Sequence, residues 1–98
     1  MIYEFPAIIK YDFNEKVYYV NFPDMSNCFT DGENLHEALN NAEDVLNLML
    51  LNAECKGEKI PTPTNIEKIG EKNLGHGEIV ALIKADTDLY SKISKIAV

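Results

Sequence analysis

Four carboxylates stand where a metal-dependent nuclease could use them. Asp12 and Asp24 each follow an expected strand, and Glu37 and Asp44 fall on an expected helix. A two-magnesium nuclease needs such oxygen ligands at short range. The pattern is weak, because Asp12 lies in a turn where Asp is favoured anyway and the first strand offers only Glu4 as a leading carboxylate. We therefore assign no catalytic residue and expect no enzyme activity.

Thiols and imidazoles provide a second candidate for chemistry. Cys28 and Cys55, together with His36 and His76, could form a zinc site or a Cys–His nucleophile pair. None of the four shares the C-x₂₋₄-C or H-x₃₋₅-H spacing typical of structural zinc sites. Nothing around either cysteine indicates activation of the thiol. We expect two free thiols, buried or half-buried, with no metal site and no cofactor.

The negative charge of the chain lies in its first half. The net charge is −7, and residues 1–55 contain ten carboxylates but only Lys10 and Lys16, whereas residues 56–98 are nearly balanced. The sequence contains no arginine, the residue best suited to contacts with phosphates and bases. DNA binding by this chain alone is therefore disfavoured, and an acidic first half favours a basic partner. Solubility alone would also explain the charge.

Tyrosines on the expected sheet could form a platform on which bases stack. They are Tyr3, Tyr11, Tyr18 and Tyr19. Without basic residues between them, we interpret them as core and sheet-surface residues instead.

The pattern of apolar residues predicts the order β-β-β-α-β-α. Strand propensity and turn residues place the strands at residues 2–11, 17–22, 27–30 and 79–83. Pro6 predicts an unpaired edge or a bulge in the first strand. Asp31-Gly32 indicates a turn, residues 65–77 a long surface loop, and the last strand, apolar on both faces, a central covered position. Thr87 is expected to cap a short final helix with Leu89, Ile93 and Ile96 on one face.

The helix after the third strand is the clearest element. Apolar residues recur at three- and four-residue steps from Leu35 to Ala53. Asn34 and Glu37 form a capping-box pattern at its start, and Gly57 suits the left-handed position after its end. This gives an α+β fold, a three-stranded antiparallel sheet plus a fourth strand, with one long helix packed on it.

Length and hydropathy indicate one domain over residues 1–98. Ninety-eight residues can bury a single core without metal or disulfide support. The longest apolar run, Leu48 to Leu51, is too short for a membrane span, and the N-terminal residues do not form a signal peptide. We expect a cytoplasmic protein.

Five sequence blocks, in order, resemble the HicB family of antitoxins. They are Phe5-Pro6-Ala7-Ile8-Ile9, Val17 to Asp24 ending in Phe-Pro-Asp, Cys28-Phe29-Thr30-Asp31-Gly32-Glu33-Asn34-Leu35, Glu37-Ala38-Leu39-Asn40-Asn41-Ala42, and Ile60-Pro61-Thr62-Pro63-Thr64. The resemblance covers residues 3–64 well and residues 78–90 more loosely.

The resemblance implies a fold and a role. The fold is similar to a partial ribonuclease H or to a dsRNA-binding-like unit. The role is that of an antitoxin in a type II toxin–antitoxin system, which binds and neutralises a small basic HicA-type toxin that cleaves mRNA. It also implies a dimer or tetramer. Many family members carry a C-terminal DNA-binding segment, which the resemblance places beyond Val98 and outside this chain.

An acidic patch is expected to meet the toxin. Its candidate residues are Asp24, Asp31, Glu33 and Glu37, of which Asp31 also suits a turn and Glu37 a helix cap. The alternative is an orphan HicB-like module that interacts with protein or RNA and has no toxin partner.

Overall fold

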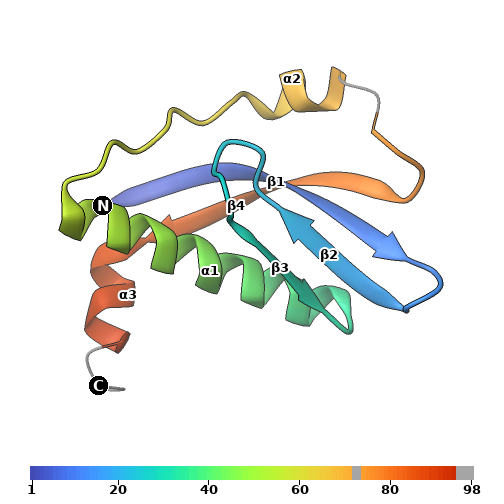
Figure 1. Ribbon diagram of the computed structural model, residues 1–98, viewed down its shortest axis with the longest axis horizontal. Helices are drawn as coiled ribbons and strands as arrows, with labels where there is room; N and C mark the ends of the chain where they lie inside the picture. Colours follow the sequence, from blue (N-terminus) through green and yellow to red (C-terminus); the bar gives the residue numbers. More distant parts are fainter. Residues whose placement is uncertain (72–73, 95–98) are drawn as a thin grey trace.

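The computed structural model describes residues 1–71 and 74–94 as a four-stranded antiparallel sheet with helices on it (Figure 1). The expected α+β fold class is confirmed. The elements in chain order are β1 (Ile2–Asp12), β2 (Val17–Asn21), β3 (Phe29–Gly32), α1 (Leu35–Lys56), α2 (Ile66–Glu71), β4 (Glu78–Asp86) and α3 (Thr87–Ser94).

The strands lie in the order β3-β2-β1-β4, so β3 and β4 form the two edges of the sheet. The turn from β1 to β2 is the expected hairpin, in which Asp12 Oδ1 accepts hydrogen bonds from the backbone N–H groups of Asn14 (2.9 Å) and Glu15 (3.0 Å). Pairing between β1 and β2 covers Ile8 to Asp12 only. Pro6 therefore lies beyond the end of β2, where its missing N–H breaks no bond to that strand.

Helix α1 begins and ends as its sequence predicts. Asn34 Oδ1 accepts a hydrogen bond from the N–H of Glu37 (2.8 Å), and Glu37 Oε1 in turn accepts one from the N–H of Glu33 (3.3 Å). Gly57 ends the helix with a φ of 68°, and its N–H bonds to the carbonyl of Glu54 (3.2 Å). These caps satisfy backbone groups that the helix leaves free at its ends.

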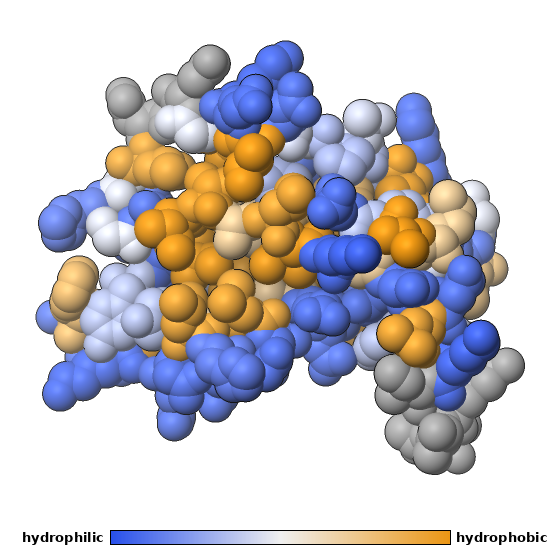
Figure 2. All heavy atoms as spheres, turned by 180° about the vertical axis from the view of Figure 1, so that it is seen from behind, coloured by the Kyte–Doolittle hydropathy of each residue, from blue (hydrophilic) through white to orange (hydrophobic). Residues whose placement is uncertain are grey.

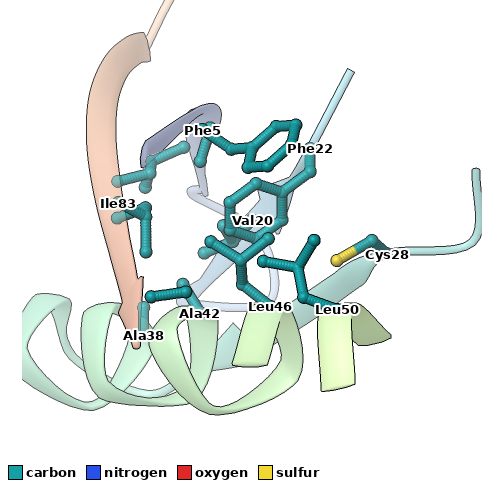
Figure 3. Packing of buried hydrophobic residues seen from close by; sticks show 12 residues of the cluster. Phe5, Val20, Phe22, Cys28, Ala38, Ala42, Leu46, Leu50 and Ile83 are labelled. Atoms are coloured by element: carbon teal, nitrogen blue, oxygen red, sulfur yellow. The ribbon is translucent and has the colours of Figure 1, made fainter. Parts of the chain in front are cut away.

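The core lies between α1 and one face of the sheet. Phe5, Val20 and Ile83 from three adjacent strands point toward Ala42 and Leu46 of the helix (Figure 3). All five are buried, and the small alanines bring the first turns of α1 close to the sheet. Burying large apolar side chains in this layer supplies most of the stabilisation of such a domain.

The expected long loop at residues 65–77 is wrong in part, because residues 66–71 form helix α2. The carbonyl of Asn65 accepts hydrogen bonds from Lys68 (3.0 Å) and Ile69 (3.3 Å), which close the first turn. Ile69 is buried and α2 contacts β4 on the side of the β1–β4 pair opposite to α1 (Figure 1). A six-residue helix depends on such tertiary packing, since it is too short to be stable alone.

The prediction of a central position for the last strand is also wrong. Strand β4 is longer than expected and lies at the edge of the sheet, paired with β1 alone among the described residues. Its apolar residues on both faces reflect cover from two sides, by α1 and by α2.

Thr87 does not cap α3. The cap is Asp86, whose Oδ1 accepts a hydrogen bond from the N–H of Leu89 (3.1 Å). Thr87 is instead fully buried, and its hydroxyl donates to Glu54 Oε2 (3.0 Å) and accepts from the N-terminal ammonium of Met1 (3.1 Å). Leu89 is exposed, while the Ile93 side chain and Ile96 lie outside the described residues.

The same carboxylate of Glu54 also holds the start of β1. Tyr3 donates its hydroxyl proton to Glu54 Oε2 (2.5 Å). Burial, together with the neighbouring Glu54 charge, raises the pKa of Tyr3 to about 12. Glu54 on α1 therefore joins both ends of the described chain, at Tyr3 and at Thr87.

Gly32 is the tightest contact between helix and sheet. The sequence indicated a turn at Asp31-Gly32, but both residues belong to β3, which runs two residues later than expected. A Cβ atom at position 32 would lie 2.7 Å from Ala38 Cα and 3.0 Å from Ala38 Cβ, and closer still to the Ala38 backbone nitrogen. Only glycine allows α1 to approach β3 at this point.

We predict that Gly32→Ala destabilises the fold, because backbone atoms of α1 cannot move away without opening the core. The expected loss is about 2–4 kcal/mol, or a fall in Tm of roughly 10 °C or more, measured by thermal and urea unfolding. The matched control is Gly70→Ala in α2, where an added Cβ would meet nothing within 4 Å. Equal Tm values for the two variants would contradict the tight contact.

Candidate partner-binding surface

Three of the four acidic residues expected to bind a partner occur where β3 leads into α1. Asp31, Glu33 and Glu37 are all exposed, but the strand register places the Asp31 side chain on the Tyr19 face of the sheet, away from α1. The capping bonds described above hold the Glu37 carboxylate against the backbone N–H of Glu33, so the Glu37 side chain is positioned by the helix start. The cap leaves both carboxylates at the surface, and a capping role does not prevent contact with a partner.

Asp24, the fourth residue, does not join this patch. It is half-buried in the turn between β2 and β3, and its carboxylate accepts hydrogen bonds from the N–H (2.9 Å) and the hydroxyl (2.5 Å) of Thr64. These bonds fasten the proline-rich segment after α1 to the turn. Asp24 is therefore used inside the fold.

A groove continues from the patch along α1. Its lining residues come from β3, α1 and α3, and they are Thr30, Asn41, Asp44, Val45, Leu48 and Tyr90. The groove has a volume of about 200 Å³. Asn41 connects it to the patch, because its side-chain amide donates to the backbone carbonyl of Asp31 (2.9 Å). A second, smaller hollow shares Tyr90 and is lined by Glu43, Asn47, Asp86 and Leu89.

The surface formed by the patch and the groove combines negative charge with apolar contact area. Asp44 lies beside the exposed side chain of Leu48 and the half-buried Tyr90. No lysine or arginine occurs between Lys16 and Lys56, so the stretch from Asp31 to Leu48 contains carboxylates but neither of these basic residues. Among the described residues, the one ion pair is that of the Met1 ammonium with Asp88 (2.8 Å). A charged rim around apolar anchors is the usual composition of a protein–protein interface.

Sequence reasoning missed the groove for a physical reason. Asn41, Asp44, Val45 and Leu48 share one side of α1 by helical spacing, which the sequence does reveal. Tyr90 completes the groove from α3, more than forty residues away, and only the packing of α3 against α1 brings it there.

The carboxylates and thiols considered for catalysis lie apart or are engaged. Asp12 holds the β1–β2 turn, and Asp24 holds Thr64. Within residues 1–71 and 74–94, no three His, Cys, Asp or Glu side chains lie close enough to share a metal ion. Cys28 is buried in the core, where desolvation raises the pKa of its thiol to about 11, and Cys55 is exposed.

The tyrosines do not form a single platform. The strand register places Tyr3, Tyr11 and Tyr18 on the face that α1 covers and Tyr19 on the other face. The rings of Tyr11 and Tyr18 lie 4.7 Å apart between centroids, and the Tyr19 hydroxyl donates to Glu15 (2.6 Å). The interpretation of these residues as core and sheet-surface residues agrees with this arrangement.

In the part of the chain that the structure describes, no helix is both long and apolar enough to cross a membrane.

Comparison with known proteins gives one family. Residues 5–98 match the model of a family described as the HicB-like antitoxin of bacterial toxin–antitoxin systems. No curated protein sequence matches the chain.

Solved structures similar to this chain belong to the same kind of protein. One is a toxin–antitoxin complex from Streptococcus pneumoniae, with a TM-score of 0.78 and 22% identity over 92% of this chain and 73% of that one. Another is the N-terminal domain of the Burkholderia pseudomallei antitoxin HicB, with a TM-score of 0.74 and 26% identity over 86% of this chain and 99% of that one. A third is a HicA3 and HicB3 toxin–antitoxin complex, with a TM-score of 0.67 and 22% identity over 88% of this chain and 99% of that one.

We predict that the two cysteines differ sharply toward a thiol reagent. In the native protein Cys55 reacts within minutes and Cys28 does not, because the thiolate is the reactive form and burial both shields it and raises its pKa. Counting modified thiols with and without urea checks this, and Cys55→Ser should remove all native reactivity. Equal rates for both thiols in the native state would be incompatible with the packing of Cys28.

Proposed function

The chain belongs to the HicB-like antitoxin family of bacterial toxin–antitoxin systems, and from this premise we propose that it binds and neutralises a small basic toxin of the HicA type. The observation that carries the proposal is the exposed acidic surface on α1, from Glu37 to Asp44, with Glu33 beside it, in a stretch from Asp31 to Asp44 that contains no lysine or arginine. Such a surface attracts a basic protein and repels the RNA that the toxin cleaves.

In the proposed mode of action, this chain covers the RNA-binding surface of the toxin. A toxin that recognises RNA presents a basic surface, and the acidic patch would replace RNA as the partner of that surface. Leu48 and Tyr90 would supply apolar contact at the centre, and the surrounding carboxylates would steer the approach. The HicA3 and HicB3 complex is a precedent for such a pairing in a protein of similar fold.

The proposal assigns binding and no reaction to this chain. The engagement of Asp12 and Asp24 in turns and of Cys28 in the core supports this assignment. Because the substrate of the toxin would be mRNA, both proteins would act in the cytoplasm.

We predict that reversing charges on this surface slows association with the toxin. Glu33→Lys/Asp44→Lys should reduce the association rate constant about tenfold or more at low salt, and less at high salt, where charges are screened. Stopped-flow or surface-binding kinetics with a small basic HicA-type toxin, sought first in the neighbouring gene, would measure it. Glu67→Lys in α2, which lies on the other side of the sheet, is the control and should change little.

The outcomes separate the proposal from its alternative. Equal association rates for the double variant and the control would place the toxin on another surface. An absence of binding by the unaltered chain would favour an orphan interaction module and overturn the antitoxin proposal.

We also predict that the apolar floor of the groove governs the lifetime of the complex. Leu48→Ala should raise the dissociation rate constant about fivefold or more and leave the association rate nearly unchanged, since short-range packing acts after encounter. Leu48 is 48% exposed, so its truncation should alter folding stability little. Leu89→Ala, at the neighbouring hollow and 56% exposed, provides the comparison. An unchanged dissociation rate for Leu48→Ala would exclude the groove from the contact.

A further inference from the structure

Strand β4 presents an open row of backbone groups. In an antiparallel pair, residues alternately direct their N–H and C=O groups toward the partner strand and away from it. Thr87 N–H donates to the Met1 carbonyl (3.0 Å), and Tyr11 N–H donates to the Gly77 carbonyl (3.5 Å), so odd-numbered residues along this side bond to β1. Even-numbered residues of β4 therefore point their backbone groups away from β1, toward the open edge.

The open row has defined ends. At one end the N–H of Asp86 donates to Asn47 Oδ1 (3.0 Å), and at the other the N–H of Glu78 donates to the Gly75 carbonyl (3.1 Å). Between them, Val80, Leu82 and Lys84 face the edge, and within residues 1–71 and 74–94 no strand pairs with this side. An edge strand of this length is a template for pairing with another strand.

The side chains beside the open row are apolar. Ile79 is 52% exposed and Leu82 is 49% exposed, although they lie on opposite faces of the sheet. Helices α1 and α2 lie on the two sides of the β1–β4 pair (Figure 1). Seen from behind, apolar side chains gather across the middle of the molecule, with hydrophilic ones above and below (Figure 2). An apolar centre with a polar rim marks a surface that binds protein.

We propose that β4 pairs antiparallel with β4 of a second copy of this chain, about a two-fold axis at Ala81. This inference goes beyond toxin binding and does not rest on it. Val80 and Leu82 of each copy then exchange backbone hydrogen bonds, and Ala81 lies opposite Ala81 of the second copy, where a small side chain is needed because non-hydrogen-bonded pairs approach most closely. The two sheets join into one.

Charge complementarity identifies a second copy as the occupant. In this register Glu78 lies opposite Lys84 of the second copy, and Lys84 lies opposite Glu78. Within one chain Lys10 pairs with Glu78, and Glu4 pairs with Lys84. One row of side chains across the joined sheet therefore alternates in sign, in the order Lys10, Glu78, Lys84 and Glu4, which stabilises cross-strand pairs.

The register centred on Leu82 is worse. A shift that centres the axis on Leu82 would place Glu78 opposite Asp86, a pair of like charges. It would also require the N–H of Asp86, which already donates to Asn47. The register about Ala81 places opposite charges together and leaves the Asp86 N–H on Asn47; of its paired residues only Glu78 has an N–H already in use, on the Gly75 carbonyl.

A charge-swap experiment on the full chain tests the register. Sedimentation equilibrium from about 1 to 200 μM covers the range expected for an interface of modest area. The unaltered chain should dimerise. Glu78→Lys alone and Lys84→Glu alone should each weaken the dimer about tenfold or more, because each places like charges opposite one another twice per dimer. An equimolar mixture of the two variants should regain dimerisation, since the mixed pair carries opposite charges at both positions.

The rescue by mixing shows that both variants are folded, and circular dichroism of each checks this independently. Phe29→Lys, on the opposite edge strand β3 and 64% exposed in the unaltered chain, is the matched control and should leave the dimer intact. A monomer at all concentrations would overturn the proposal. So would a dimer that neither charge variant weakens, or variants that remain monomeric on mixing. Toxin binding is measured in a separate experiment, so a failure to bind the toxin can be distinguished from a failure to dimerise.

Discussion

The close approach of α1 to β3 at Gly32 is the constraint on which the rest of the molecule depends. An L side chain at this position would collide with the backbone of Ala38, and Ala38 and Ala42 are themselves small enough for the helix to lie near the sheet. This approach sets the depth of the core layer that Phe5 and Leu46 fill. It also fixes the start of the helix relative to the edge strand. The acidic residues at that junction are therefore positioned by packing in the core beneath them.

Hydrogen bonds made by side chains complete what this packing begins. Asn41 donates to the carbonyl of Asp31, and Glu54 accepts from Tyr3 at the beginning of the chain and from Thr87 near its end. Asn47, buried on the same helix, donates to the carbonyl of Glu43 and accepts from the N–H of Asp86. Helix α1 thus binds the sheet through polar groups along its length as well as through its apolar side. Buried polar side chains that are fully bonded favour one arrangement over others.

Local signals in the sequence predicted those parts of the structure that depend on nearby residues. The caps of α1 at Asn34 and Gly57, the turn at Asp12 and the fold class all follow from short-range patterns, and the structure confirms them. The errors concern long-range packing. Helix α2, the edge position of β4 and the buried role of Thr87 depend on neighbours distant in the chain.

In the candidate site, too, some features follow from the sequence and others depend on long-range packing. Composition and the order of the motifs predicted an acidic surface that includes Asp31, Glu33 and Glu37; all three are exposed, and Glu37 contacts the backbone of Glu33. Asp24 carries the same charge, yet Thr64 draws it into the fold from forty residues away. Tyr90 reaches the groove only through the packing of α3. The sequence shows which residues carry charge. The tertiary structure determines whether a carboxylate forms hydrogen bonds within the fold or stays exposed to a partner.

The two proposed interfaces lie at opposite edges of one sheet, and this has a consequence for assembly. The acidic surface adjoins β3, and the open row of backbone groups belongs to β4, with β2 and β1 between them. A pair of chains joined at β4 would therefore carry its two acidic surfaces at its outer ends. Each copy has a net charge of −7, and separating the acidic surfaces across the full width of the joined sheet keeps their mutual repulsion small at physiological ionic strength, where screening acts over about 8 Å. A basic partner bound to the acidic surface of one copy would neither block nor require a partner on the acidic surface of the other copy. The edge order of the sheet thus allows two functions to use one small domain without competing for the same residues.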